Sequence, residues 1–359
     1  MPDAIHQFVP SFVPRDAIGT HTRALRTLLH ELGIESDLYV GEAREAGRGE
    51  VRDYLSYEGA RPGQRTWLMY QLSTGSKVAE YLLNRPEPKL VDYHNITPPE
   101  FFFPWEAHVG VELDHGRQQI PLLSGCTDLA FADSAYNEAE LIEVGFPKTV
   151  VGPIFVDYDS FDQGVDTGLL DSLQSTRRGG HWLFVGRIAP NKCQHEIVKA
   201  FAAYRRVYDN GARLTLVGGS SSHAYLTAIK NYIQALGLDD AVTLTGNISQ
   251  QALSAYYKAA DVFVCLSEHE GFCVPLLEAI YNRLPVVAFD AAAVPETLGD
   301  GGLLLSDKSS VAVAAVVDRV VRDLSLREAL TAAGQARLAA FSTERVREIW
   351  VDALKSLTG

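Results

Sequence analysis

The sequence predicts an α/β protein of two domains whose parallel sheets face a central cleft. The chain has 359 residues, which is more than one hydrophobic core usually supports, so we expect two domains with a cleft between them. The second half alternates short apolar strands with amphipathic helices, the pattern of a parallel sheet covered by helices on both faces. The first half shows the same alternation less regularly, and it is again α/β.

Charge and hydropathy exclude several classes of protein. Residues 1–150 contain 13 Lys and Arg against 22 Asp and Glu, and the remainder contains 19 against 23. Neither segment is basic, which argues against a nucleic-acid partner. The longest apolar runs fall far short of the roughly 20 residues that a membrane span requires. A local basic patch that touches anionic lipid stays open, because counts of charge do not exclude it.

The N-terminus and the cysteines point to one compartment. Residues 1–19 carry acids and prolines where a signal peptide needs a basic start and an apolar stretch, so we interpret them as mature sequence. The four cysteines form no CxxC pair, which fits a reducing compartment and argues against a structural metal. We therefore expect a cytoplasmic protein, with peripheral contact at the inner face of the membrane left open.

The elements of the first half follow from apolar periodicity. Residues 24–33 form an amphipathic helix that leads to the strand 35–40, and residues 66–72 and 89–94 are further apolar strands. Turn formers and acids then dominate residues 152–180, so we place the interdomain linker near the start of that stretch.

The elements of the second half are more regular. We expect strands at 181–187, 214–219, 241–246, 261–267, 284–290 and 301–305, and helices at 195–208, 224–237, 250–260 and around 275–283, followed by two C-terminal helices. The predicted domains are 1–155 and 156–340, with the last helix, 341–359, as a separate segment.

The strongest motif is the segment Glu270 to Glu278, EGFCVPLLE. It follows a predicted strand, and ligands of doubly wound sheets sit at the carboxyl ends of strands. Pro275 is typical of the first turn of a helix. The backbone amides just before that turn would then form a site for phosphate or hydroxyl oxygens, and they belong to Phe272, Cys273 and Val274. Glu270 would sit at the mouth of the turn, and Glu278, one turn into the helix, could accept hydrogen bonds from a vicinal diol.

This segment resembles the retaining glycosyltransferases of glycosyltransferase family 4, which have the GT-B fold of two Rossmann-like domains. The resemblance implies that Glu270 contacts the hydroxyls of a donor sugar and that Glu278 contacts the ribose, with Gly271 in the turn between them. Cys273 stands where a glycine is more common in the family. Without these surroundings, Glu278 would be interpreted as a solvated helix residue.

A second motif, FVGRIAPNK, places two cations at a strand-to-helix turn, Arg187 and Lys192. Two cations there suit a diphosphate, and the resemblance assigns them to the diphosphate of the donor. They would neutralise the departing nucleotide as the glycosidic bond breaks. The alternative is a pair of ordinary surface salt bridges.

Further candidates come from the resemblance. Loops after two strands hold the nucleotide and its base through Gly218, Asn247 and Ile248. A histidine at the end of the strand 89–94, His94, lies against the donor sugar and the reacting centre, although a histidine at a strand end is by itself more often structural. Gly19 lies in a loop ahead of a helix, where the family usually has two glycines. The resemblance also implies an acceptor-binding N-terminal domain, a nucleotide-sugar-binding C-terminal domain, and a last helix that returns to the N-terminal domain.

The resemblance implies transfer of a mannose- or glucose-type hexose from a GDP- or UDP-linked donor to a glycan, lipid-linked or small-molecule acceptor, as in polysaccharide assembly. Glu270 and His94 are the candidate catalytic residues, and no metal or separate cofactor is expected. Three alternatives remain. The triplet Asp157–Tyr158–Asp159 is the metal motif of a different, GT-A class of transferase. The other two are a sugar-nucleotide epimerase of the same fold and a non-catalytic sugar-nucleotide-binding protein.

Overall fold

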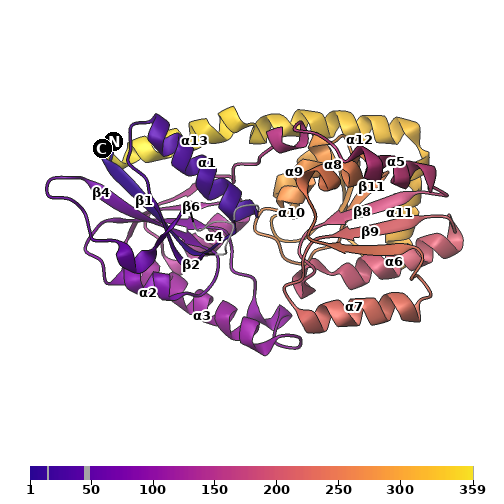
Figure 1. The fold of residues 1–359 in the computed structure, drawn as a ribbon, viewed down its shortest axis with the longest axis horizontal. Coiled ribbons are helices and arrows are strands. Elements are labelled where there is room, and N and C mark those ends of the chain that lie inside the picture. The colour runs from indigo at the N-terminus through magenta and orange to yellow at the C-terminus, as the bar shows by residue number, and fades with distance from the viewer. Residues whose placement is uncertain (14–15, 44–48, 359) are drawn as a thin grey trace. The chain divides into compact units, whose positions relative to one another are not determined.

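The structure, a computed structural model, describes residues 1–13, 16–43 and 49–358, and it divides into two compact units (Figure 1). Unit 1 comprises Met1–Phe103, Ala107–Val156 and Ala340–Gly359, and unit 2 comprises Pro104–Glu106 and Asp157–Ala339. None of the described helices is long and apolar enough to span a bilayer.

Unit 1 is a seven-stranded parallel sheet in the order β3-β2-β1-β4-β5-β6-β7. In Figure 1, α1 and α13 lie on one face of this sheet and α2 and α3 on the other. The elements are β1 (Ala4–Phe12), α1 (Ala17–Glu31), β2 (Leu38–Ala43), β3 (Arg52–Asp53), β4 (Thr66–Leu72), α2 (Lys77–Leu83), β5 (Lys89–Tyr93), α3 (Ala107–Ser124), β6 (Thr127–Ala132), α4 (Ala135–Val144), β7 (Thr149–Val151) and α13 (Thr343–Lys355).

Strand β1 is central in the sheet, yet the sequence analysis did not predict it. Polar residues interrupt its apolar pattern, and their burial depends on partners far along the chain. Gln7 is fully buried; its amide donates to the carbonyl of Thr22 at 3.1 Å and its side-chain oxygen accepts from Gln71 at 3.0 Å. Such polar groups are tolerated in a core because their hydrogen bonds are satisfied.

Helix α13 is anchored in unit 1 by one aromatic side chain. Trp350 is fully buried and stacks on Phe131 with ring centroids 4.0 Å apart. Its indole Nε1 donates to the carbonyl of Pro153 at 3.1 Å. A tryptophan buried in this way contributes both apolar area and a satisfied polar tip.

Unit 2 is a six-stranded parallel sheet in the order β10-β9-β8-β11-β12-β13. Helices α6 and α7 cover one face and α8 and α9 the other (Figure 1). The elements are α5 (Thr167–Ser175), β8 (His181–Val185), α6 (Gln194–Val207), β9 (Arg213–Val217), α7 (His223–Ala235), β10 (Val242–Gly246), α8 (Gln250–Ala259), β11 (Val262–Cys265), α9 (Val274–Tyr281), β12 (Val286–Phe289), α10 (Val294–Leu298), β13 (Leu303–Leu305), α11 (Ser310–Arg322) and α12 (Leu324–Arg337). The strands and helices predicted for this half are all present.

One helix of unit 2 was not predicted, and one prediction about the end of the chain was wrong. The stretch 152–180 contains α5, whose amino end is capped by the carboxylate of Asp166, which accepts from the amide of Leu169 at 2.9 Å. Three helices, α11, α12 and α13, follow β13 where two were predicted. Asp323 separates the first two: its backbone is extended and its side chain caps α12. A capping aspartate stops one helix and starts the next within a single residue.

Candidate functional site

Two loops at the carboxyl edge of the unit 2 sheet are joined by Asn191. Its side-chain amide donates to the carbonyl of His269 at 3.0 Å, and its own carbonyl accepts from the amide of Glu268 at 2.9 Å. Asn191 is buried. The loop after β8 and the loop after β11 are therefore held in register, because parallel strands end at the same edge of a sheet.

Lys192 and Glu270 meet where these loops touch. The Lys192 ammonium donates to a carboxylate oxygen of Glu270, and the two side chains are 19% and 6% exposed. Burial alone would lower the pKa of Lys192, but the Glu270 carboxylate and Cys273 together outweigh it, and the pKa is raised. The positive charge of the Arg187 guanidinium opposes that rise in pKa. Arg187 itself is exposed.

The start of α9 has the geometry that the sequence predicted. Val274 is its first residue, Pro275 lies in its first turn, and Cys273 precedes it with a φ of 74°. That conformation favours glycine, which accounts for the glycine preference at this position in the family. As the first helical residue, Val274 has no partner for its amide within the helix.

The turn before α9 is held in place by α10. The backbone carbonyl of Glu270 accepts from the amide of Ala293 at 3.2 Å, and the carbonyl of Phe272 accepts from the hydroxyl of Thr297. Gly271 is half-buried and Phe272 is buried. The turn is thus rigidly positioned, as a preorganised binding loop requires.

Glu278 is half-buried, and its partner is a tyrosine. Its carboxylate accepts a hydrogen bond from the hydroxyl of Tyr257 at 2.8 Å. Burial raises the pKa of Glu278 to about 7; the Tyr257 hydrogen bond lowers it, and the carboxylate of Asp157 raises it further. Without a ligand to donate hydrogen bonds, the charged form of this carboxylate is poorly stabilised.

The loops after β9 and β10 also meet. Gly218 has a φ of 137°, and a Cβ added to it would lie 2.1 Å from the carbonyl oxygen of Gly186, so no other residue fits there. Its amide donates to the carbonyl of Gly246 at 3.2 Å. Asn247 is exposed and its side-chain amide lies against Gly219, while Ile248 is half-buried.

His94 lies at the carboxyl end of β5 in unit 1, inside a buried polar network. Nδ1 faces both carboxylate oxygens of Asp133 at 3.1 Å, and Nε2 lies 2.6 Å from the side-chain oxygen of Gln71. Burial alone would lower the pKa of His94, but the carboxylates of Asp133 and Asp92 outweigh it and raise the pKa to about 9. Both ring nitrogens thus face acceptors, and the side chain is 1% exposed.

Gly19 belongs to the first turn of α1 rather than to the loop ahead of it. Its amide donates to the carboxylate of Asp16, the residue that caps the helix, at 2.7 Å. A Cβ at this position would lie 2.0 Å from the carbonyl oxygen of Val13. Close backbone packing therefore requires glycine here. The preceding residues 14 and 15 lie outside the described part of the chain.

In unit 2 the structure brings Arg187, Lys192 and Glu270 together beside the 271–274 turn. Gly218 and Asn247 lie on the neighbouring pair of loops. In unit 1, Asp16 contributes to the raised pKa of His94, so the cap of α1 and the end of β5 lie near one another.

The sequence analysis missed the residues that support the site in unit 2. Asn191 and Thr297 position the binding loops, and Tyr257 contacts Glu278. Asn191 alone carried a local signal, because it adjoins Lys192 in the motif. Thr297 and Tyr257 act through contacts with distant residues, and nothing in their own surroundings in the sequence marks them.

Clusters of metal-ligating side chains do not include the Asp157–Asp159 triplet. Among the described residues, the groups whose ligand atoms lie within 4.8 Å of one another are His21, Asp92 and His94 in unit 1, and Cys265, Glu270 and Cys273 in unit 2. The carboxylate of Asp157 accepts from the amide of Ser160 at 3.1 Å, as in an ordinary turn.

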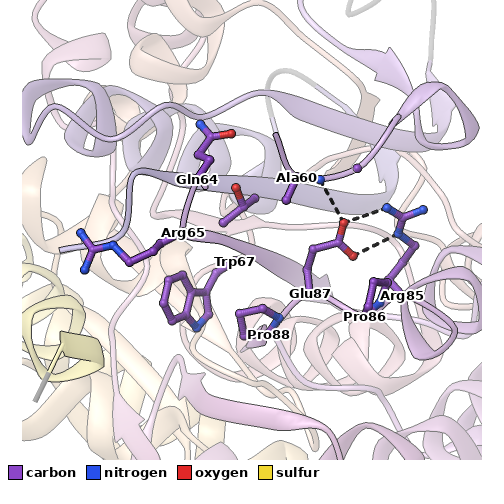
Figure 2. A pocket seen from close by; sticks show the side chains of 10 residues that line it. Ala60, Gln64, Arg65, Trp67, Arg85, Pro86, Glu87 and Pro88 are labelled. Carbon is purple, nitrogen blue, oxygen red and sulfur yellow. Dashed lines mark hydrogen bonds and ion pairs between the residues drawn. The ribbon is translucent and has the colours of Figure 1, made fainter. Parts of the chain in front are cut away.

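A pocket of about 530 Å³ in unit 1 lies apart from the predicted residues of that unit (Figure 2). It is at the amino ends of β4 and β5, whereas His94 follows the carboxyl end of β5. Figure 2 shows Glu87 between the Ala60 amide, at 3.2 Å, and the Arg85 guanidinium, at 2.7 Å. Its buried carboxylate is therefore already satisfied within the protein.

Residues 178–337 match the family described as glycosyl transferases group 1. The chain is 32% identical over 160 residues to the GDP-mannose-dependent alpha-(1-6)-phosphatidylinositol monomannoside mannosyltransferase of Mycobacterium tuberculosis, covering 42% of this chain and 40% of that protein. It is 30% identical over 235 residues to the D-inositol 3-phosphate glycosyltransferase of Frankia alni, covering 63% and 57%. The matches thus span less than two thirds of the length of these relatives.

Solved structures share the fold over nearly the whole chain. Anabaena HepE in complex with UDP and glucose has a TM-score of 0.74 at 17% identity, covering 98% of this chain and all of that one. Sucrose-phosphate synthase from Thermosynechococcus elongatus has a TM-score of 0.76 at 18% identity, covering 99% of both chains. The predicted fold class, GT-B with two Rossmann-like domains built on parallel sheets, is confirmed.

Proposed function

We propose that the protein is a retaining glycosyltransferase, because residues 178–337 match the family described as glycosyl transferases group 1. It moves a hexose of the mannose or glucose type from a GDP- or UDP-linked donor to a glycan, lipid-linked or small-molecule acceptor. The observation that carries this proposal is the Lys192–Glu270 pair beside Arg187, at the carboxyl edge of the unit 2 sheet. The mannosyltransferase relative supports a mannose donor.

The two cations hold the diphosphate of the donor. Lys192 and Arg187 place two positive charges where loops from β8 and β11 meet, and charge-assisted hydrogen bonds to phosphate oxygens are about twice as strong as neutral ones. As the bond to the sugar breaks, negative charge grows on the departing phosphate, and the cations stabilise that charge. Binding in the ground state and stabilisation in the transition state thus use the same side chains.

Two glutamates hold the sugars of the donor. Glu270 accepts from hydroxyls of the transferred sugar, and its pairing with Lys192 keeps its carboxylate oriented in the absence of donor. Glu278 accepts from the ribose diol. Gly218, Asn247 and Ile248 hold the nucleotide mainly through their backbones, and the turn from Gly271 to Val274 offers amides to the donor.

The proposed reaction takes place on one face of the sugar. The bond between the anomeric carbon and the phosphate oxygen breaks, and an acceptor oxygen forms the new bond from the same side, through an oxocarbenium-like state. The proton of the acceptor hydroxyl passes to the departing phosphate. Charge stabilisation comes from Lys192 and Arg187, so the proposal includes no metal ion and no cofactor beyond the donor.

His94 is the second candidate catalytic residue. A catalytic role would require its imidazole to contact the donor sugar. Both ring nitrogens face Asp133 and Gln71, so contact with a donor sugar requires one of these hydrogen bonds to be exchanged. Unless that exchange occurs, His94 is a positioning residue that holds the end of β5. The variants described in the Discussion separate the two roles.

A panel of GDP- and UDP-linked hexoses tests the proposal. We expect one donor to raise the unfolding temperature and to release its nucleoside diphosphate only when an acceptor is supplied. Interconversion of the sugar without an acceptor would identify an epimerase instead, and binding without any turnover would identify a sugar-nucleotide-binding protein. Absence of both donor binding and nucleotide release across the panel would refute the proposal.

A further inference from the structure

Two thiols and a carboxylate converge behind the turn that begins α9. Cys265 ends β11 and Cys273 caps α9, with Glu270 in the loop between them. The ligand atoms of these three residues all lie within 4.8 Å of one another. Two sulfur ligands at about 2.3 Å from a tetrahedral zinc ion lie about 3.8 Å apart, which is within that limit. The three residues are buried, at 1%, 8% and 6% exposure respectively.

The chemistry of this set selects one class of ion. Thiolates favour zinc and other soft or borderline divalent ions, whereas magnesium and calcium prefer sites made of oxygen. The thiols of Cys265 and Cys273 are also hydrogen-bonded to each other. The Cys265 sulfur lies 3.3 Å from the buried hydroxyl of Ser267.

We propose that Cys265, Cys273 and Glu270 form a binding site for a thiophilic divalent cation such as Zn²⁺, and that this cation competes with the sugar of the donor for Glu270. The competition rests on the proposed function, because it requires Glu270 to hold donor hydroxyls. The cation site itself does not. This is inhibition by a metal ion, in contrast to the metal-assisted catalysis of GT-A enzymes.

The balance of charge explains why the ion would inhibit rather than assist. On binding, the two thiols lose their protons, and the two thiolate charges cancel the two positive charges of the ion. The net charge around Lys192 and Glu270 is therefore unchanged, and the diphosphate gains no extra attraction. What changes is the carboxylate of Glu270, which binds the metal and no longer accepts from sugar hydroxyls. Hydrogen bonds to a charged group contribute about 1.5–3 kcal/mol, so sugar-nucleotide affinity should fall about ten- to a hundredfold.

Cadmium titration of the full chain tests the cation site without any nucleotide. The protein is reduced and carries no polyhistidine tag, and the thiolate-to-cadmium charge-transfer band is followed in the ultraviolet. We expect one equivalent of Cd²⁺ to produce the band in the wild type and in the control Cys126→Ser. Cys265→Ser and Cys273→Ser should each lose the high-affinity band, and Cys273→Gly, which suits the left-handed backbone at this position, should lose it without a folding defect. A band that persists in the Cys265 and Cys273 variants, or no band in the wild type, would overturn the site.

Calorimetry tests the competition. GDP-mannose or UDP-glucose, whichever binds the metal-free protein, is titrated with and without Zn²⁺, and the free nucleoside diphosphate serves as a ligand that lacks the sugar. Zinc should weaken sugar-nucleotide binding about ten- to a hundredfold in the wild type, and leave Cys265→Ser unaffected. That variant also corrects for zinc bound by the diphosphate in solution. Equal zinc effects in the two proteins would overturn the competition. Failure of every GDP- and UDP-linked hexose in the panel to bind the metal-free protein would refute the proposed function and, with it, the competition, while the cadmium titration still decides the cation site.

Discussion

The ammonium of Lys192 donates a hydrogen bond to the carboxylate of Glu270, from a loop 78 residues away in the chain. The carboxylate raises the pKa of Lys192 in a largely buried position. A ligand that carries both a diphosphate and a sugar can take over both halves of this ion pair, because the phosphate replaces the carboxylate and the hydroxyls replace the ammonium.

We expect Lys192→Ala and Glu270→Gln each to lower turnover by about 100- to 1,000-fold, the usual effect of removing one group that stabilises developing charge. The measurement is release of nucleoside diphosphate in the presence of acceptor. Lys199→Ala is the matched control, because Lys199 is an exposed lysine on the following helix that pairs with Glu196. Wild-type turnover in both site variants would contradict the assignment.

The affinity for the donor should depend on the charge of Glu278. Its pKa is raised to about 7, and only the carboxylate form accepts two hydrogen bonds from a diol. Affinity should therefore rise with pH and level off above about 7, changing up to tenfold per pH unit below that value. Calorimetric titrations across this range measure the effect.

Two variants separate the contribution of Glu278 to the pH dependence of donor affinity from that of the donor phosphates, which also titrate. Glu278→Gln should remove the part of the change in donor affinity with pH that is caused by ionisation of the Glu278 carboxyl group. Tyr257→Phe removes the hydrogen bond that lowers the pKa of Glu278, so the midpoint should move to higher pH. An identical profile for wild type and Glu278→Gln would exclude a role of this carboxylate.

His94 should stabilise unit 1 in a pH-dependent manner. Its folded pKa of about 9 lies above the ordinary value of 6.5. The stability that it contributes is therefore fully present below about 6.5 and is lost as the pH rises through about 9. Hydrogen exchange of unit 1 amides at increasing pH, corrected for the intrinsic exchange rate and with unit 2 amides as an internal reference, should show this loss.

His94→Gln distinguishes a catalytic from a positioning role. Removing one partner of a buried charged network costs about 3–5 kcal/mol, so the variant should weaken protection in unit 1 and remove its dependence on pH. A catalytic contact predicts in addition a lower kcat for the fraction that remains folded. Unchanged protection with a large loss of kcat would show that the buried network is not the main role of His94.

Trp350 should contribute much of the free energy that holds α13 against the sheet of unit 1. Trp350→Ala removes the stack on Phe131 and the hydrogen bond to Pro153, and large-to-small changes of this kind cost about 3–5 kcal/mol. Urea unfolding measures the loss. Asp352→Ala on the same helix is the control, since its side chain is 77% exposed. Equal midpoints for the two variants would contradict the packing described here.

Transfer should not require a divalent metal, because Lys192 and Arg187 supply the positive charge. Turnover measured after exhaustive treatment with EDTA should equal or exceed that of untreated protein, and added Mg²⁺ or Mn²⁺ should not increase it. A loss of activity with EDTA that Mn²⁺ restores would instead favour the metal mechanism associated with the Asp157–Asp159 triplet.

Sequence patterns were sufficient to predict those elements whose structure depends on neighbouring residues in the chain. The strands of unit 2 follow from short apolar runs between helices, and the turn before α9 follows from Pro275 and the adjacent Glu-Gly pair. The central strand β1 was missed because the burial of Gln7 depends on Gln71 and Thr22. Helix α5 was missed because turn formers and acids dominate the stretch around it, although its half-buried leucines, Leu169, Leu170 and Leu173, recur at helical spacing.

The candidate site, too, was predicted from the sequence only in part. The sequence alone determined which loops carry Arg187, Lys192 and Glu270, because parallel strands bring their following loops to one edge of a sheet. It also determined that Glu278 follows in the next helix. Only the tertiary structure decided that Lys192 pairs with Glu270, that two cysteines lie behind this carboxylate, and that His94 is enclosed by acceptors. Burial and pairing set charge and reactivity, and both depend on residues that are distant in the chain, which periodicity and spacing do not encode.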